Sequence, residues 1–145
     1  GDGEQAEGSV WEAAMFASHY GLGNLTAIID YNKLQISGDV DTVMKISSLA
    51  DRWASFGWGV RELDGHDMDA LTAELGSGES RFEALPEAPK LIIAHTIKGR
   101  GVSFIEGDPA WHHRVPTDEQ LERATAELQA EIGRLSAPAQ QEVPR

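Results

Sequence analysis

Two oxygen-bearing side chains near the start of the chain have the types and spacing of a cation site. Asp2 lies in the opening tripeptide Gly1-Asp2-Gly3, and Asn32 follows an apolar run that ends at Asp30. A carboxylate and an amide oxygen are hard ligands that suit Mg²⁺ or Ca²⁺. One helix-length and one strand-length segment separate them, as in a crossover that returns two parallel strand ends to one edge of a sheet. The pair predicts a divalent cation at that edge, although either motif alone also fits a turn.

Composition narrows the classes of function. The 145 residues carry a formal net charge of −12, which repels nucleic acid and anionic membranes. An acidic chain that binds a diphosphate needs a bound cation, backbone N–H groups or a helix N-terminus. The chain has no Cys, which excludes disulfides, zinc thiolate sites and cysteine nucleophiles and fits a reducing cytoplasm. No window approaches the length of a membrane span. We therefore expect a cytoplasmic protein with neither nucleic acid nor membrane as partner.

Apolar periodicity along the chain alternates between helix and strand. Helices are predicted over residues 9–20, 48–56, 67–75 and 117–135, and strands over 25–30, 58–63 and 90–96. This alternation predicts an α/β fold with a mainly parallel sheet and flanking helices. The apolar runs of 25–30 and 90–96 are typical of central strands covered on both faces. Residues 33–46, 76–89 and 97–116 are predicted loops, of which the last is long enough to be functional.

Local signals define several helix ends and single residues. Capping boxes are predicted at Ser9 with Glu12 and at Thr117 with Gln120, and Asp67 is a predicted N-cap. The tryptophans in periodic segments and two of the histidines are expected in the core, packed or hydrogen-bonded: Trp11, Trp53, Trp58, His19 and His95. His66 is expected in a turn, and Trp111 is expected to support the 97–116 loop. No G-x-G-x-x-G follows a strand, which argues against a nucleotide-binding Rossmann domain.

Three extended strings give the sequence a specific resemblance. GDGEQAEGSVWEAAMFASHYGLGNLTAIIDYNKLQISG, LADRWASFGWGVRELDGHD and TIKGRGVSFIEGDPAWHHRVP resemble transketolases over roughly residues 1–130. The resemblance implies the thiamine diphosphate-binding fold, with a partial diphosphate-binding domain over residues 1–135. Residues 136–145 are rich in Pro, Gln and Glu, which predicts a flexible tail. Transketolases carry further material before GDG, so we expect the domain to be N-terminally truncated here.

The resemblance also implies ligands for the cofactor and its cation. Asp2, the Asn32 side chain and the Leu34 backbone carbonyl match the protein ligands of Mg²⁺ or Ca²⁺, which anchors the diphosphate of thiamine diphosphate. Gly3 lets the backbone approach the diphosphate closely. Lys98 matches a residue near the diphosphate, and from its loop position alone it fits a solvated lysine equally well.

Two further residues take their implied roles from the same resemblance. His112 matches a catalytic histidine that handles substrate or cofactor near the thiazolium, and histidine exchanges protons near neutral pH. His113 is the weaker candidate, because the match falls on the first histidine of the pair. Glu7 matches a glutamate at the subunit contact, and it otherwise fits an acid that interacts with a helix dipole.

The implied activity is transfer of a two-carbon ketol unit from a ketose phosphate to an aldose phosphate. The active site of transketolases forms with a pyrimidine-binding domain of the partner subunit, so we expect a dimer and an inactive isolated chain. This chain could be the N-terminal member of a transketolase split into two chains. Deoxyxylulose-phosphate synthase, a pyruvate dehydrogenase component and a non-catalytic cofactor-binding or scaffold subunit stay open as alternatives.

Overall fold

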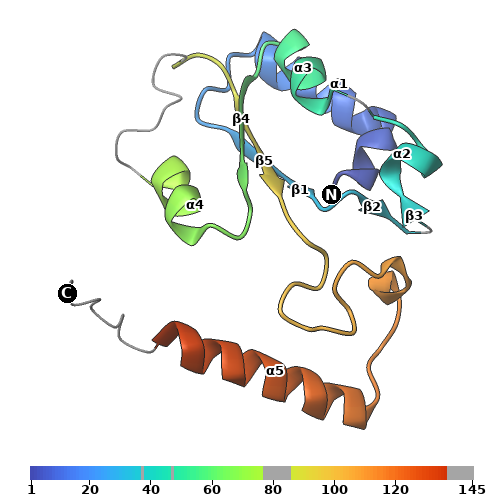
Figure 1. Ribbon diagram of the computed structural model, residues 1–145. Helices are drawn as coiled ribbons and strands as arrows, with labels where there is room; N and C mark the ends of the chain where they lie inside the picture. The colour runs from blue at the N-terminus through green and yellow to red at the C-terminus, as the bar shows by residue number, and fades with distance from the viewer. Residues whose placement is uncertain (37, 47, 77–85, 137–145) are drawn as a thin grey trace, which may run out of the picture. The chain divides into compact units, whose positions relative to one another are not determined.

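The computed structural model describes residues 1–36, 38–46, 48–76 and 86–136, in two compact units, Gly1–Ile97 and Lys98–Arg145 (Figure 1). The first unit contains η1 (Gly3–Ala6), α1 (Gly8–His19), β1 (Thr26–Tyr31), β2 (Leu34–Gln35), β3 (Gly38–Asp39), α2 (Val40–Val43), α3 (Leu49–Ser55), β4 (Gly59–Asp64), α4 (Met68–Leu75) and β5 (Lys90–His95). The second contains η2 (Pro109–His112) and α5 (Asp118–Ser136). Residues 77–85 of the expected surface loop and 137–145 of the expected tail lie outside the described residues.

A three-stranded parallel sheet in the order β1-β5-β4 organises the first unit. The central strand β5 has neighbours on both sides and elements over both faces, so Leu91, Ile92 and Ile93 are at most 1% exposed. In Figure 1, α1 and α3 lie over one face of the sheet and α4 lies on the other side. The predicted α/β fold with a mainly parallel sheet and flanking helices is confirmed.

The core lies between the sheet and the helices α1 and α3. Trp53 and Trp58 are 4% and 6% exposed, and Trp11 is half-buried with its ring centroid 5.5 Å from that of Trp53. The Trp58 indole Nε1–H donates to the carbonyl of Ala14 in α1 at 3.0 Å. Burial of these aromatic bodies, with their N–H groups paired, holds α1 and α3 on the sheet. The core prediction for the three tryptophans is confirmed.

The prediction that residues 25–30 form a central strand covered on both faces is wrong. Among the described strands β1 pairs with β5 alone and lies at an edge. Successive strand residues point to opposite faces. Ile29 packs into the core and is 3% exposed, whereas Ile28 on the other face is 51% exposed, because no described element covers it there.

Residues 33–46 form more than the predicted loop. Leu34–Gln35 pairs with Gly38–Asp39 as a short antiparallel ladder, and α2 follows at once. The Asp39 carboxylate accepts from the Asp41 backbone N–H at 2.8 Å and caps that helix. Two-residue strands are too short to show a hydrophobic period, so the pattern could not reveal them.

Two of the three predicted caps are confirmed. Thr117 N–H donates to the Gln120 side chain at 2.9 Å, and Gln120 N–H donates to the Thr117 hydroxyl at 3.3 Å, as in a capping box. The Asp67 carboxylate accepts from Ala70 N–H at 2.9 Å. The Ser9 cap is wrong: η1 runs almost directly into α1, so the break falls at Glu7 and Ser9 lies inside the helix.

The structure confirms some of the predictions made for the histidines and contradicts others. His19 is exposed on the outward side of α1, edge-on to the Tyr20 ring, so its core placement is wrong. His95 is half-buried and hydrogen-bonded, with its Nε2 2.7 Å from the Glu62 carboxylate, and His66 lies in a turn. The predicted hydrogen bonding of His95 and the turn position of His66 are confirmed, whereas the predicted core position of His95 is wrong, because its side chain is 39% exposed at the strand end.

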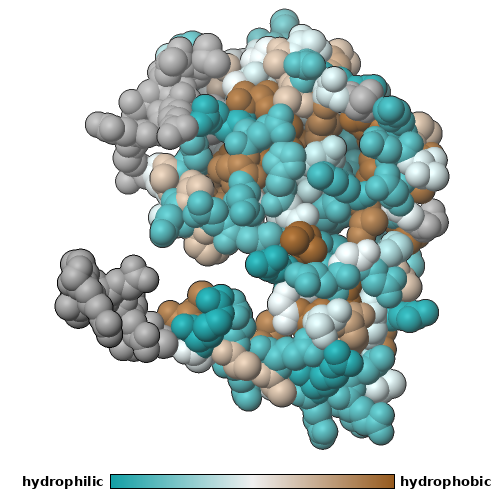
Figure 2. Space-filling model, viewed as in Figure 1, coloured by the Kyte–Doolittle hydropathy of each residue, from teal (hydrophilic) through white to brown (hydrophobic). Residues whose placement is uncertain are grey.

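Surface character matches the composition. Hydrophilic residues cover most of the face shown in Figure 2, in keeping with the formal net charge of −12. In the parts of the chain that the structure describes, no helix combines the length and apolar character needed to cross a membrane.

Candidate functional site

The opening tripeptide lies beside the carboxyl end of β1. Asp2 N–H donates to the Asp30 carbonyl at 3.1 Å. The Asp2 carboxylate accepts from its neighbour Gly3 N–H at 2.8 Å and, across the crossover, from Lys33 N–H at 2.5 Å. Lys33 has a φ of 65°, a conformation uncommon for a residue with a side chain. The turn after β1 is therefore shaped around Asp2.

Asn32 and Leu34 belong to the same turn. The Asn32 Oδ1 accepts from Leu34 N–H at 2.9 Å, and its Nδ2 donates to the Asp30 carboxylate at 3.4 Å. The structure thus brings Asp2 to the turn that carries Asn32 and Leu34, three of the residues predicted to bind the cation. Each of the three can offer an oxygen as a ligand, from the Asp2 carboxylate, the Asn32 amide and the Leu34 backbone carbonyl, which suits a hard divalent cation.

The electrostatics of Asp2 favour a cation beside it. Asp2 is 2% exposed, and this burial raises the pKa of its carboxyl group. Hydrogen bonds from Lys33 and Gly3 act in the opposite direction, and the nearby Asp30 charge raises the pKa further. A bound cation would offset the cost of the buried charge.

The donor set also limits which ligand could bind. Within the described residues, no group of three or more His, Cys, Asp or Glu side chains could hold a metal ion. A cation at Asp2 would therefore need neutral oxygens from the protein and further oxygens from outside it. Amide and carbonyl oxygens at Asn32 and Leu34, together with a diphosphate, fit that requirement.

Gln5 ties the tripeptide to the core, a role that sequence reasoning missed. Its side chain is 5% exposed, accepts from Trp53 Nε1–H at 3.1 Å and donates to the Gly1 carbonyl at 3.2 Å. Its backbone carbonyl accepts from Trp11 Nε1–H at 2.9 Å. A buried glutamine is recognisable only from its partners, which lie elsewhere in the sequence.

Gly3 occupies a position with no room for a side chain. A Cβ there would lie 2.7 Å from Cγ of Gln35. The close approach of β2 to the tripeptide is one physical reason for glycine at this position, independent of any ligand.

Further polar residues connect the strand ends, and sequence reasoning missed their contacts. The Thr96 hydroxyl donates to the Asp30 carboxylate in a short hydrogen bond. The His66 Nε2 accepts from Ile97 N–H at 2.8 Å, which requires a bare ring nitrogen. The backbone N–H of His66 donates to the Asp64 carboxylate at 2.9 Å. These bonds link the β4–α4 turn, the end of β5 and the end of β1.

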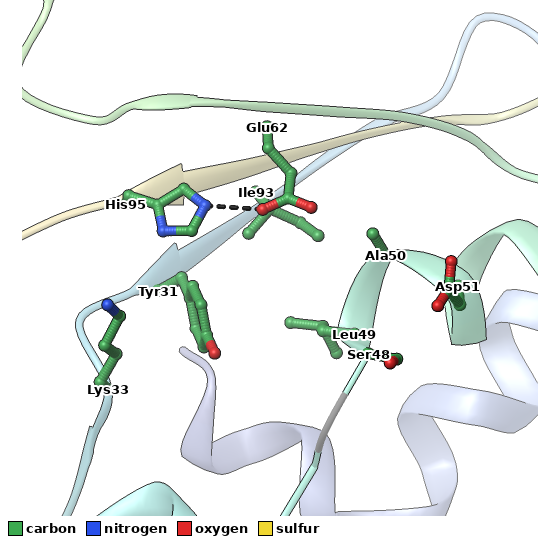
Figure 3. Close-up of a pocket in the computed structure, with 9 residues that line it drawn as sticks. All are labelled: Tyr31, Lys33, Ser48, Leu49, Ala50, Asp51, Glu62, Ile93 and His95. Carbon is green, nitrogen blue, oxygen red and sulfur yellow. Dashed lines mark hydrogen bonds and ion pairs between the residues drawn. The ribbon is translucent and has the colours of Figure 1, made fainter.

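A cavity of about 460 Å³ opens between the strand ends and the start of α3 (Figure 3). Tyr31 and His95 lie side by side at the strand ends with their rings edge-on, and His95 pairs with Glu62 at 2.7 Å. The start of α3, with Leu49, lies across the cavity from them (Figure 3). Lys33 contributes both to the turn around Asp2 and to this cavity. Its backbone N–H donates to the Asp2 carboxylate, and its side chain lines the cavity.

Lys98 and His112 belong to the second unit, whereas Asp2, Gly3, Asn32 and Leu34 belong to the first. The Lys98 carbonyl accepts from Gly107 N–H at 2.9 Å, which closes a compact loop. His112 is exposed at the end of η2, with its ring edge-on to that of His113. The assignments of Lys98 and His112 stay predictions.

Trp111 supports the loop that carries His112. Its Nε1–H donates to the Phe104 carbonyl at 3.0 Å, and the two rings pack edge to face with centroids 5.4 Å apart. The Arg123 guanidinium lies 4.9 Å from the centroid of the Phe104 ring. The predicted supporting role of Trp111 is confirmed.

Comparison with known proteins gives one family. The family described as "Transketolase, thiamine diphosphate binding domain" matches residues 1–134. The chain is 48% identical over 135 residues to an apulose-4-phosphate transketolase subunit of Phocaeicola vulgatus, covering 93% of this chain and 47% of that protein. It is 43% identical over 131 residues to a 6-deoxy-6-sulfo-D-fructose transketolase subunit of a Clostridium species, covering 90% and 46%. The chain thus spans about half the length of these relatives.

Solved structures agree on the fold. The transketolase of Campylobacter jejuni superposes with a TM-score of 0.75 at 26% identity, covering 87% of this chain and 19% of that one. The transketolase of Leishmania mexicana superposes with a TM-score of 0.63 at 23% identity, covering 91% and 23%, which bears on the fold alone.

Proposed function

This chain belongs to the family of transketolase thiamine diphosphate-binding domains, and we propose that it is the diphosphate-binding part of a transketolase. The proposed reaction moves a two-carbon ketol unit from a ketose phosphate to an aldose phosphate. The relatives described above are named for apulose 4-phosphate and 6-deoxy-6-sulfo-D-fructose. A phosphorylated or similarly anionic ketose is therefore the proposed substrate class.

One observation carries this proposal: the carboxylate of Asp2 is buried against the turn that holds Asn32 and Leu34. The 2.5 Å hydrogen bond from Lys33 N–H to Asp2 joins residues far apart in the sequence at the carboxyl end of β1. Ligands of open parallel sheets bind at this end of the strands. Asp2, Asn32 and the Leu34 carbonyl are the proposed ligands of Mg²⁺ or Ca²⁺, with the cofactor diphosphate completing the coordination.

The remaining residues keep the roles that the resemblance to transketolases implies. Lys98 is proposed to bind the diphosphate through its ammonium group, and Gly3 to admit the diphosphate close to the backbone. His112 is proposed to hold or move a proton at the reacting end of the cofactor. Bound thiamine diphosphate would supply carbanion stabilisation, chemistry that none of these side chains provides.

The proposed active site needs a second component. The chain covers less than half of the relatives named above, at 47% and 46% of their lengths. We propose that a pyrimidine-binding domain or subunit completes the site, that the assembly is a dimer in the cytoplasm, and that the isolated chain does not turn over. Glu7 is exposed beside η1, where a partner could reach it.

Calorimetric titration of thiamine diphosphate tests the proposal. The chain would be mixed with a candidate pyrimidine-domain chain, with and without Mg²⁺, and compared with Asp2→Ala and Asn32→Ala. Asp67→Ala is a matched control, because that carboxylate caps α4 instead. We expect Mg²⁺-dependent binding that both site variants lose and the control keeps. Binding unaffected by either site variant would refute the cation site, and no binding by a folded mixture would favour a non-catalytic subunit.

Substrate assays separate the nearest alternatives. Ketol transfer between sugar phosphates supports transketolase activity. Condensation of pyruvate with glyceraldehyde 3-phosphate would indicate a deoxyxylulose-phosphate synthase instead, and oxidative decarboxylation of pyruvate would indicate a pyruvate dehydrogenase component.

A further inference from the structure

Asp30 lies at the centre of the proposed cation site without being one of its proposed ligands. Its backbone carbonyl accepts from Asp2 N–H at 3.1 Å. Its carboxylate oxygen Oδ1 accepts from two side chains, the Thr96 hydroxyl and the Asn32 amide. Asp30 therefore contacts both the acid and the amide that are proposed to bind the cation.

The hydrogen-bond partners of Asn32 determine where its amide nitrogen and its amide oxygen point. An ionised carboxylate only accepts hydrogen bonds, so the Asn32 atom that faces Asp30 must be the NH₂ nitrogen. A backbone N–H only donates, so the atom 2.9 Å from Leu34 N must be the carbonyl oxygen. Rotating the amide by half a turn would place donor against donor at Leu34 and acceptor against acceptor at Asp30.

This polarity matters for a cation, because only the oxygen of the amide can bind one. The Asn32 oxygen has two lone pairs, and Leu34 N–H occupies one of them. The second lone pair accepts no hydrogen bond from the residues that the structure describes, so it can bind a cation. A flipped amide would present hydrogens there and repel the ion.

Thr96 holds Asp30 in the required place. Its hydroxyl donates to the same carboxylate oxygen that accepts from Asn32, and its backbone N–H donates to the Tyr31 carbonyl at 3.2 Å. The Thr96 methyl packs against Gly65, where an added Cβ would lie 2.5 Å from it. Thr96 is thus fixed by the end of β1 and by the turn after β4.

We propose that Asp30, held by Thr96, is a positioning residue that fixes the Asn32 amide with its oxygen available to the cation. This inference rests on the proposed function, because it concerns the same cation. Asp30 acts through Asn32 and does not need to touch the ion. Outer residues of this kind typically change metal affinity by about 10–100-fold when they are replaced.

Two pairs of variants separate positioning from simple charge. Asp30→Asn keeps the size but lets the side chain donate as well as accept, so it no longer selects one end of Asn32. Asp30→Glu keeps the charge but moves the carboxylate. Thr96→Val removes only the donor, and Thr96→Ser restores it. Asp64→Asn is the charge control, because that carboxylate lies at the end of β4 and accepts from His66 N–H.

The first readout needs no cation. In the metal-free full chain labelled with ¹⁵N-asparagine, we expect Asn32 to give an NH₂ pair with one proton shifted downfield by its bond to Asp30. That signature should be lost in Asp30→Asn and Asp30→Glu, weakened in Thr96→Val, and kept in Thr96→Ser and Asp64→Asn. An unchanged Asn32 signal in Asp30→Asn would overturn the positioning role.

The second readout is the affinity for Mn²⁺, followed by electron paramagnetic resonance with the full chain and its partner. We expect about tenfold weaker binding in Asp30→Asn and Asp30→Glu, a smaller loss in Thr96→Val, and near wild-type binding in Thr96→Ser and Asp64→Asn. Equal Mn²⁺ binding by wild type and Asp30→Asn, or full retention by Asp30→Glu, overturns the positioning role alone. No site-specific Mn²⁺ binding by wild type overturns the cation site, and the proposed function with it.

Discussion

Replacing Gln5 by leucine should destabilise the fold by removing the two hydrogen bonds of its buried side chain. The substitution leaves the Trp53 Nε1–H without its acceptor, in a residue that is only 4% exposed, which costs about 1–3 kcal/mol. Loss of the hydrogen bond to the Gly1 carbonyl adds about 1 kcal/mol. We therefore expect Gln5→Leu to lower the free energy of unfolding by about 2–4 kcal/mol.

The matched control is Gln35→Leu, the same substitution at another glutamine. The Gln35 Oε1 is buried and has no hydrogen-bond partner among the residues that the structure describes. Leucine there removes an unpaired polar atom, so we expect no loss of stability and a gain of at most about 1 kcal/mol. Both glutamines contact the opening tripeptide, at Gly1 and at Gly3 respectively, which makes the pair comparable.

Urea unfolding of the single and double variants completes a cycle. Trp53→Phe alone leaves the Gln5 Oε1 unpaired, whereas Gln5→Leu combined with Trp53→Phe leaves neither partner buried and unsatisfied. We expect the double variant to lose about 1–3 kcal/mol less free energy of unfolding than the two single variants lose together. Additive losses, within about 0.5 kcal/mol, would refute the idea that Gln5 acts through Trp53. So would equal destabilisation by Gln5→Leu and Gln35→Leu.

Three further perturbations follow from the described contacts. Gly65→Ala would place a Cβ 2.5 Å from Thr96 and should cost about 1–3 kcal/mol through overpacking, measured by urea unfolding. Thr117→Ala removes the reciprocal cap of α5 and should cost about 1 kcal/mol of stability, whereas Thr117→Ser should cost little. Hydrogen bonds from the Ser103 backbone and hydroxyl lower the pKa of Glu127 below its usual 4.5. The stabilisation should therefore be present above pH 4.5 and be lost as the pH falls through the lowered pKa, so unfolding curves of wild type and Glu127→Gln should differ at pH 7 and converge in acid.

The sequence predicted the fold where a pattern was long enough to carry a period. β4, β5, α3 and α4 lie within one or two residues of their predicted ranges. The failures have physical reasons. An apolar run reports that a strand has apolar side chains but not what covers them, so β1 was misplaced as central. The ladder of Leu34–Gln35 with Gly38–Asp39 is set by the turn around Asp2, a contact that no local signal encodes.

The sequence predicted the candidate ligand residues, but it did not predict the residues that hold them in place. Asp2 and Asn32 stand out because their chemistry and spacing are readable along the chain. Gln5, Asp30 and Thr96 act through partners in distant segments, such as the bond from Thr96 to Asp30. Glutamine, aspartate and threonine are common at surfaces and turns, so residue type alone gives no reason to select them.

The geometry of Asp2 explains why these supports matter. A carboxylate that is 2% exposed has lost most of its hydration, and this burial raises its pKa although the hydrogen bonds from Lys33 and Gly3 act in the opposite direction. Moving Asp2 toward solvent would restore hydration to its carboxylate. The bond from Gln5 to the Gly1 carbonyl and the bond from Asp2 N–H to the Asp30 carbonyl oppose that movement from either side. The core therefore holds the Asp2 carboxylate against the turn that carries Asn32 and Leu34.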